Sequence, residues 1–307
     1  MEIIKNTIDF KLEDSTAIAL GKFDGVHAGH LELINKILEQ KKTGKKAVIF
    51  TFDPAPMALF SDKPIKELTT REEKRRLFEM LGIDVVVEFP MNKKTAATPP
   101  KTFVEDYLVK KLNAGFVVAG SDVSYGDRGL GDASLLQELS KVYSYELLLV
   151  DKIKYEAEEI SSTLVRDKVL EGNMELVAGL CGRPYFVDGI ISHGNHVGRT
   201  WEIPTINIYP EANKLLPPNG VYYSEVVIDN KRIKGMTNVG TKPTVSDVNR
   251  MSVETYLYDF DEDVYGKNAT VELLTYKRPE KRFDDVEELK AQIKSDILKG
   301  REYFMLD

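Results

Sequence analysis

The 307-residue chain contains one cysteine and one tryptophan, and it has no long apolar run. A lone cysteine excludes a disulfide within the chain and fits a reducing compartment, so we expect a cytoplasmic protein. The N-terminal residues lack the apolar centre of a secretion signal, and no stretch approaches the roughly 18 apolar residues of a membrane-spanning helix. These absences predict an intracellular protein with no membrane partner.

Positive charge is also scarce. The chain has 42 Lys and Arg residues against 49 Asp and Glu, a formal net charge of −7 and an isoelectric point near 5.4. A protein that binds nucleic acid would present a basic face, so we do not expect that partner. The length suffices for two domains with separate cores, and the oligomeric state stays open.

The first half of the chain alternates short apolar strands with amphipathic helices. The expected strands are Thr16–Leu20, Lys46–Phe52, Asp84–Phe89, Phe116–Ala119 and Glu146–Val150. The expected helices are Leu31–Gln40, Arg71–Leu81, Thr102–Leu112 and Ala133–Ser140. This alternation predicts a parallel α/β sheet with helices on both faces, whose ligands lie beyond the carboxyl ends of the strands.

The second half of the chain has a different pattern of predicted elements. Helices are expected at Leu164–Glu171, capped by Ser161, Ser162 and Thr163, and at Met174–Leu180. The expected strands are Phe186–Ser192, Gly220–Ile228, Arg232–Asn238, Ser252–Tyr258 and Thr270–Tyr276. They predict an antiparallel barrel or sandwich, followed by an amphipathic helix at Val286–Leu298. We place the domains at residues 1–183 and 184–307.

The stretch Gly21–His30 joins the first predicted strand to the first predicted helix. His27 and His30 lie three residues apart, just under one helical turn, so both face one side of the helix N-terminus. That end carries unpaired N–H groups and a partial positive charge, which suit phosphate. The stretch therefore indicates a nucleotide held by two imidazoles at the carboxyl edge of the sheet.

Other interpretations of the histidine pair stay open. The pair supplies only two metal ligands, which disfavours a closed zinc site. The other candidate ligands are distant in the sequence: Cys181, His193 and His196. Two surface histidines without a role are the simplest alternative, although the flanking glycines argue against it. The stretch is not a Walker A loop, because no Gly-x-x-x-x-Gly-Lys-Ser/Thr pattern occurs.

Two segments of the second domain carry polar groups suited to a nucleotide. His193–Arg199 is dense in glycine, as in a loop whose backbone approaches a ligand, although a structural hairpin explains it as well. Thr205 and Asn207 lie two apart in an extended segment, so they point to one side. Their hydroxyl and amide oxygens are ligands that Mg²⁺ accepts, and a β-turn is the alternative interpretation.

Glu254 is the candidate base of this domain. Strand alternation places it on one face with Tyr256 and Tyr258, while residues 253, 255 and 257 take the other face. A carboxylate among aromatic rings in a barrel mouth is partly desolvated and suited to accept a proton. A solvent-facing strand glutamate is the simpler interpretation.

Seven segments, in their order and spacing, resemble those of the bacterial bifunctional riboflavin kinase/FMN adenylyltransferases, also called FAD synthetases. They are Gly21–His30, Thr51–Pro54, Ser161–Arg166, Leu180–Tyr185, Pro204–Asn207, Asn238–Thr244 and Val253–Thr255. The resemblance covers essentially the whole chain. It implies a Rossmann-like α/β domain of nucleotidyltransferase type, then an antiparallel riboflavin kinase-like β-barrel with a C-terminal helix.

The resemblance implies two reactions on the small molecules riboflavin, FMN, FAD and ATP. In the barrel, ATP phosphorylates riboflavin to FMN, with Glu254 as the base and Thr205 and Asn207 as ligands of Mg²⁺. Gly194 and Gly198 would lie near the phosphates. Because the nucleophile is a neutral alcohol, a base is useful there.

In the α/β domain, FMN would be joined to the AMP part of a second ATP, giving FAD and pyrophosphate. The nucleophile is an anionic phosphate, so positioning and charge stabilisation replace a base. His27 and His30 are then catalytic donors to the triphosphate. The remaining implied nucleotide contacts are Gly21, Phe23, Asp24, Gly25, Gly29, Ser162, Thr163 and Arg166, and the flavin contacts are Asp122 and Tyr125.

Three departures from the family pattern concern the flavin and the adenylyl step. Ala55 stands where many members have His, Val123 replaces an aromatic residue, and Glu202-Ile203 replaces Gly-Phe. They leave two alternatives to a bifunctional enzyme. One is a riboflavin kinase with a weak or lost adenylyltransferase site, and the other is a non-catalytic flavin- or nucleotide-binding regulator.

Overall fold

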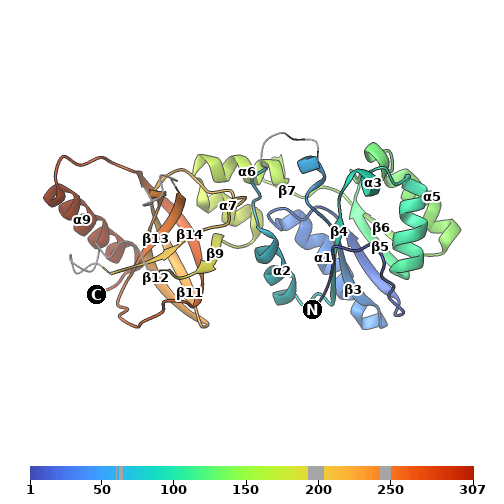
Figure 1. Cartoon of the computed structure of the whole chain (residues 1–307), viewed down its shortest axis with the longest axis horizontal. Helices are drawn as coiled ribbons and strands as arrows, with labels where there is room; N and C mark the ends of the chain where they lie inside the picture. Colours follow the sequence, from blue (N-terminus) through green and yellow to red (C-terminus); the bar gives the residue numbers. More distant parts are fainter. Residues whose placement is uncertain (60, 62–64, 193–203, 243–249) are drawn as a thin grey trace. The chain divides into compact units, whose positions relative to one another are not determined.

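The computed structural model describes residues 1–59, 61, 65–192, 204–242 and 250–307. The chain divides into two compact units, Met1–Ser162 and Thr163–Asp307, each with its own sheet (Figure 1). The boundary that we expect between the two functional domains, at residues 183 and 184, stays a prediction. Among the described residues, no helix is both long enough and apolar enough to span a bilayer.

Six strands within the described residues form the parallel sheet of the first unit, in the order β1-β4-β3-β2-β5-β6. Their bounds are Glu2–Lys5 (β1), Thr16–Leu20 (β2), Lys46–Asp53 (β3), Val85–Pro90 (β4), Ala114–Gly120 (β5) and Glu146–Val150 (β6). The five predicted strands are confirmed. Strand β1 escaped prediction because it is a short edge strand in which only Ile4 is buried.

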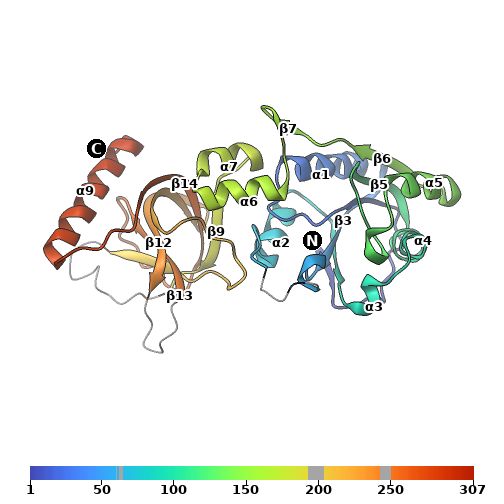
Figure 2. The ribbon, with the colours of Figure 1, turned by 90° about the horizontal axis from the view of Figure 1, so that it is seen from above.

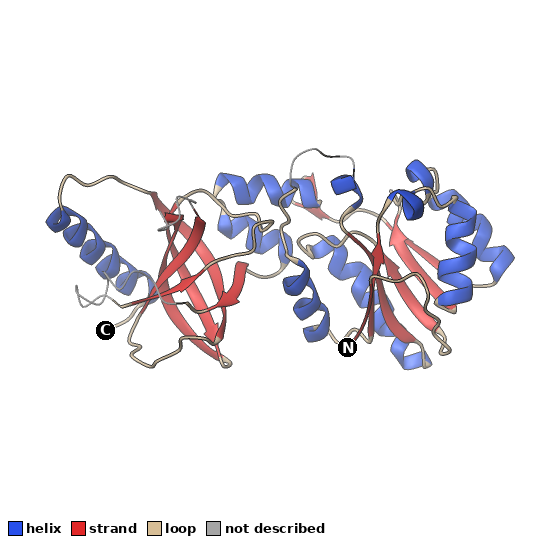
Figure 3. Cartoon of the chain, viewed as in Figure 1, coloured by secondary structure: helices blue, strands red, loops and turns tan. Residues whose placement is uncertain are grey.

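Helices cover both faces of this sheet, as Figure 3 shows. They are α1 (Ala28–Gln40), α2 (Arg71–Met80), α3 (Lys93–Ala96), α4 (Pro100–Thr102), a π-helix (Phe103–Lys111) and α5 (Ala133–Tyr143). Short 3₁₀ turns span Lys41–Thr43, Pro56–Leu59 and Asp127–Gly129, and β7 (Lys154–Tyr155) pairs with β8 (Glu158–Glu159) in a hairpin. The first predicted helix starts earlier than expected, at Ala28, and the predicted helix 102–112 is mostly a π-helix.

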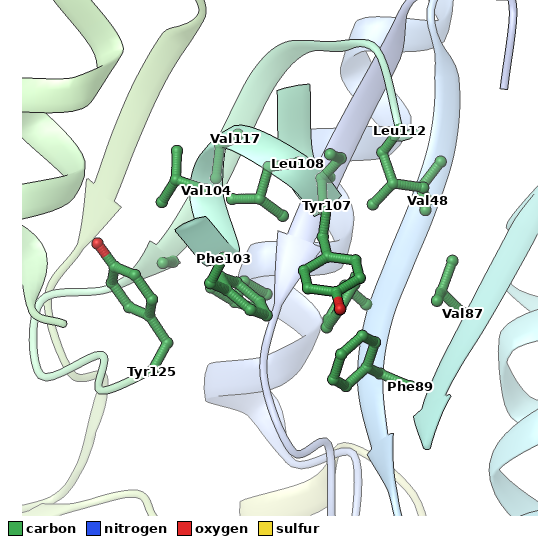
Figure 4. Packing of buried hydrophobic residues seen from close by; sticks show 14 of the residues in the cluster. Val48, Val87, Phe89, Phe103, Val104, Tyr107, Leu108, Leu112, Val117 and Tyr125 are labelled. Carbon is green, nitrogen blue, oxygen red and sulfur yellow. The ribbon is translucent and has the colours of Figure 1, made fainter. Parts of the chain in front are cut away.

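An aromatic cluster fixes the sheet against the π-helix (Figure 4). Phe89 on β4 packs edge-on against Tyr107, with the ring centroids 4.7 Å apart, and Phe50 on β3 packs edge-on against Phe103 at 5.3 Å. Such T-shaped pairs contribute roughly 0.5–1.5 kcal/mol beyond the burial of their area. The cluster therefore holds the strands whose carboxyl ends lead into the candidate site.

The second unit begins with two helices, α6 (Ser162–Glu171) and α7 (Met174–Cys181). Its sheet, within the described residues, has the order β10-β13-β12-β11-β14-β9. The bounds are Tyr185–Ile190 (β9), Thr205–Ile208 (β10), Gly220–Ile228 (β11), Lys231–Lys242 (β12), Arg250–Leu257 (β13) and Asn268–Pro279 (β14). Because α6 starts at Ser162, Thr163 lies inside the helix and is not part of a cap ahead of it.

This sheet curls until its two edge strands meet. Ser192, just after β9, donates its backbone N–H to the carbonyl of Asn207 on β10 at 2.8 Å. The prediction of an antiparallel barrel or sandwich is thereby resolved in favour of a barrel. Figure 2 shows α9 (Val286–Phe304) along its side.

Helix α9 is fastened by an ion pair in which two nitrogens of one guanidinium contact a single carboxylate oxygen. Arg278 at the end of β14 donates two hydrogen bonds to Asp296, at 2.9 and 2.6 Å, and the hydroxyl of Tyr258 donates to the carbonyl of Ile297 at 3.1 Å. Asp296 is buried, so this pair is better shielded from water than a surface pair. It sets where the segment before the helix runs.

A second shielded pair joins α2 to β4. Arg75 donates to both carboxylate oxygens of Glu88, at 2.7 and 2.6 Å, and only 11% and 5% of the two side chains are exposed. The hydrogen bonding of Arg75 to the Glu88 carboxylate is the main reason why the pKa of Arg75 is raised. The pair ties the helix to the strand across the core.

Replacing Arg75 by Ala should destabilise the first unit by about 3 kcal/mol, because Glu88 stays buried without its partner. We expect faster hydrogen exchange at the β4 amides and a lower urea midpoint. Lys110→Ala is the matched control, since Lys110 pairs with Glu105 and Asp106 at the surface, where ion pairs contribute little. Equal losses in the two variants would contradict this argument.

Candidate functional site

The loop after β2 is held in an unusual backbone conformation. Phe23, Gly25 and Val26 have φ angles of 53°, 82° and 41°, all in the left-handed region. Such a value is a real outlier for a β-branched residue such as Val26, and it persists only where surrounding contacts enforce it. Conformations of this kind cluster at functional sites.

Those contacts form a clamp between this loop and the loop before α2. The carboxylate oxygen Oδ1 of Asp24 accepts the backbone N–H groups of Leu68 and Thr69, at 2.8 and 3.3 Å. In return, the hydroxyl of Thr69 accepts the N–H of Gly25 at 3.0 Å. Ser162 adds a hydrogen bond from its hydroxyl to the Asp24 carbonyl, at 2.9 Å. These bonds leave the loop little freedom.

The loop held by this clamp leads directly into the two histidines, whose rings form a stacked pair. The rings of His27 and His30 lie 3.8 Å apart, nearly parallel at 23°. The buried ring of Phe23 supports His30 from 5.0 Å and is itself packed edge-on by Phe78. A Cβ atom on Gly29 would come within 3.3 Å of the His27 ring, so glycine gives the imidazole its space.

The pair stands at the N-terminus of α1. His27 is the N-cap residue, but its side chain makes no capping hydrogen bond, and α1 has no acidic residue in its first turn. The first N–H groups of the helix therefore meet no side-chain acceptor from the cap position and keep their partial positive charge. This is the geometry in which helices bind phosphate. The structure brings together the residues predicted there: Gly21, Phe23, Asp24, Gly25, His27, Gly29, His30 and Ser162.

The predicted flavin contacts lie after β5 and differ in their surroundings. Asp122 is exposed, and its carboxylate pairs with Lys152 at 3.3 Å. Glu159 and Asp122 together raise the pKa of Lys152. Tyr125 is buried against Phe103, and burial raises the pKa of its hydroxyl, which stays protonated. Their contacts with flavin stay predictions.

Four predicted nucleotide contacts fall elsewhere. Thr163 and Arg166 lie on α6 in the second unit, so their roles stay predictions. Gly194 and Gly198 lie outside the described residues.

In the second unit, strand register assembles another polar cluster. Asn207 on β10 lies directly opposite Glu254 on β13, and the hydroxyl of Thr205 donates to Glu254 Oε1 at 2.7 Å. Asn207 is buried, whereas Thr205 and Glu254 are partly exposed. The extended conformation of residues 205–208 confirms that Thr205 and Asn207 share a face, and it removes the β-turn alternative.

The expected alternation around Glu254 is confirmed, because residues 253, 255 and 257 are buried on the opposite face. The expectation of aromatic neighbours is only partly met. Tyr256 shares the face, but Tyr258 lies beyond the strand end and packs against Phe304 of α9. The hydroxyl and amide groups of β10 are the nearer neighbours of Glu254, and such hydrogen-bonding groups stabilise a partly buried carboxylate better than aromatic rings do.

Sequence reasoning missed several residues of both clusters. Thr69 gave no signal, because a hydroxyl in an unassigned loop has no period or motif. Asn238 was noted only within a matching segment, yet it lies directly opposite Glu254 on β12. The β12–β13 register alone would have paired the two residues.

Comparisons with known sequences match the two parts of the chain separately. The family described as FAD synthetase matches residues 9–164, and the family described as riboflavin kinase matches residues 181–304. Three similar proteins are described as bifunctional riboflavin kinase/FMN adenylyltransferase. Escherichia coli K12 has one, 35% identical over 96% of this chain and 94% of its own length. The Listeria monocytogenes protein is 35% identical over 97% of this chain and 95% of its own length. The Bacillus subtilis protein is 34% identical over 94% of this chain and 92% of its own length.

A solved structure from Streptococcus pneumoniae is also similar. It is described as a macrolide-efflux protein and is 29% identical, with a TM-score of 0.85. The likeness covers 97% of this chain and 98% of that one.

Replacing Gly25 by Ala should cost about 3 kcal/mol, because a left-handed alanine is strained and its Cβ would lie 2.9 Å from Leu68. Gly44→Ala is the matched control: Gly44 has the same φ of 82°, with no atom near its Cβ position. We expect it to cost only about 1 kcal/mol. Urea midpoints of the two variants test the difference, and equal values would show that the clamp does not constrain this loop.

Proposed function

The chain belongs to the family of bifunctional riboflavin kinases/FMN adenylyltransferases, and from this premise we propose how its residues divide the two reactions. It is an enzyme that uses ATP to phosphorylate riboflavin to FMN, and to adenylylate FMN to FAD with release of pyrophosphate. We assign adenylylation to residues 1–183 and phosphorylation to residues 184–307. A cytoplasmic location is proposed from the cysteine content.

The observation that carries the kinase assignment is the hydrogen bond between Thr205 and Glu254. It orients the carboxylate on a strand face that also bears Asn207. Glu254 accepts the proton of the riboflavin 5′-hydroxyl as that oxygen attacks the γ-phosphorus of ATP, and ADP leaves as the bond between the γ-phosphorus and the β–γ bridging oxygen breaks. Removal of a base of this kind typically costs about 10²–10⁴-fold in rate.

The same face fits a hard cation. Thr205 and Asn207 offer a hydroxyl and an amide oxygen on one side of β10, and Thr205 has already committed its proton to Glu254. Oxygen donors of this kind, completed by phosphate and water, suit Mg²⁺. We propose that these two residues hold it; when bound, it neutralises charge on the ATP phosphates.

We assign the adenylyl step to the stacked histidines at the start of α1. The phosphate of FMN is already anionic, so the residues there orient the triphosphate and stabilise its charge. His27 and His30 donate hydrogen bonds to phosphate oxygens, together with the N–H groups of the first helical turn. The clamp at Asp24 and Thr69 keeps these donors aligned before ATP arrives.

Two substitutions should separate the reactions. Glu254→Gln should lower FMN formation from riboflavin by about 10²–10⁴-fold and leave FAD formation from supplied FMN intact. His27→Ala should do the reverse, with a loss of about 10²–10³-fold in FAD formation. Chromatographic separation of FMN and FAD over time measures both. Loss of both products in each variant would contradict two separate sites, and wild-type FMN without FAD would favour a kinase alone.

The role of Thr205 can be tested without removing Glu254. Thr205→Val keeps the shape but loses the hydrogen bond to the carboxylate and an oxygen ligand, so FMN formation should fall about 10²-fold. Thr205→Ser keeps the hydroxyl and should retain most activity. If the two variants were equally active, the hydroxyl would have no part in the reaction.

A further inference from the structure

A second carboxylate is built into the neighbourhood of Glu254. Glu280 is the first residue after β14, in the segment that leads to α9. Its Oε2 accepts the side-chain N–H of Asn219 at 3.1 Å, and its Oε1 accepts that of Asn238 at 3.4 Å. Among the described residues it forms no ion pair. Two amides, and no cation, therefore hold this carboxylate in place.

The backbone of β12 makes room for this carboxylate. A Cβ atom on Gly240 would overlap Oε1 of Glu280 and would come within 3.2 Å of Nδ2 of Asn238. Glycine at position 240 thus allows the carboxylate to lie against the strand. Glu280 is an exposed residue, and its carboxylate is set apart from other surface side chains by this close approach to β12 and by its two amide hydrogen bonds.

Strand register links Glu280 to the kinase site. Asn238 lies directly opposite Glu254 in the β12–β13 pairing, just as Asn207 does in the β10–β13 pairing. Directly opposed residues point to the same face, with Cβ atoms about 4.5–5.5 Å apart. Glu254 therefore has an asparagine on each side, and Glu280 holds the amide of one of them.

Holding the amide decides what Asn238 offers. Its NH₂ group donates to Glu280, so the carbonyl oxygen Oδ1 is the end turned away from that carboxylate, and it is an acceptor. Riboflavin carries further hydroxyls along the chain next to its reacting 5′-hydroxyl. Asn238 lies directly opposite Glu254, so its amide oxygen is an acceptor within reach of a hydroxyl next to one that contacts the base.

We propose that Glu280 is a positioning residue for the kinase reaction: it orients Asn238 so that its amide oxygen accepts a hydrogen bond from a ribityl hydroxyl of riboflavin. The inference rests on the proposed role of Glu254. It makes this contact a determinant of specificity for a polyhydroxylated chain. Because the contact is made in the bound substrate, it acts on KM for riboflavin more than on kcat.

The test is a double-mutant cycle on the full chain. Glu280→Ala and Asn238→Ala should each raise KM for riboflavin about 10-fold, the scale of one lost hydrogen bond, with kcat and KM for ATP within about twofold. The double variant should be no worse than Asn238→Ala, because Glu280 acts through Asn238. Glu280→Gln, which keeps the shape and one acceptor oxygen, should lie between wild type and Glu280→Ala.

Two controls separate this role from general support of the fold. Asn219→Ala removes the other amide from the same carboxylate and should leave KM near the wild-type value. Glu287→Gln changes an exposed glutamate nearby in the chain that pairs with Lys290 at the surface, and it should leave KM for riboflavin unchanged. An unchanged kcat and an unchanged KM for ATP in the kinase reaction report that the barrel of each variant is folded, whereas FAD formation from supplied FMN reports only on the first unit.

Three results would overturn the inference: additive effects in the double variant, a fall in kcat at constant KM, or an Asn219→Ala defect equal to that of Asn238→Ala. Wild-type KM in both Glu280 variants would overturn it as well. If instead the Glu254→Gln variant still formed FMN at the wild-type rate, the proposed role of Glu254 as the base would be contradicted, whatever the Glu280 variants show. The two failures are therefore distinguishable.

Discussion

The first site depends on the exchange of hydrogen bonds between Asp24 and the loop at Leu68 and Thr69. These bonds hold Gly25 and Val26 in the left-handed region, and without them that conformation is unfavourable for a β-branched residue. The stacked imidazoles and the first turn of α1, which has no side-chain cap, follow from it. The strained loop thus holds hydrogen-bond donors in positions that need no rearrangement when a charged ligand binds. Electrostatic stabilisation requires such preorganised donors.

The second site is organised by register instead of strain. Pairing of β10, β13 and β12 places Asn207, Glu254 and Asn238 side by side on one face, and Thr205 reaches Glu254 diagonally. No residue there needs an unusual backbone angle. The proposed division of the two reactions matches these two constructions. The alcohol needs a base held by neighbours, whereas the phosphate needs a fixed array of donors.

Most of the fold was predictable because it depends on local periodicity. The buried runs of β2–β6 and the alternation around Glu254 are visible in the sequence. The start of α1 was misplaced, because Gly29 at its first turn is a poor helix former, and tertiary contacts at Phe23 and Thr69 override that preference. The candidate residues His27, His30, Thr205, Asn207 and Glu254 came from motifs. Thr69 and Glu280 did not, since each acts across a distance in sequence that no local pattern records.

The overlap between Gly240 and Glu280 has a consequence for how this chain tolerates change. A side chain at position 240 and the observed placement of the Glu280 carboxylate exclude each other, although 40 residues separate the two positions in the sequence. A side chain added at position 240 would displace the Glu280 carboxylate from the strand, and its hydrogen bond to Asn238 would be lost with it.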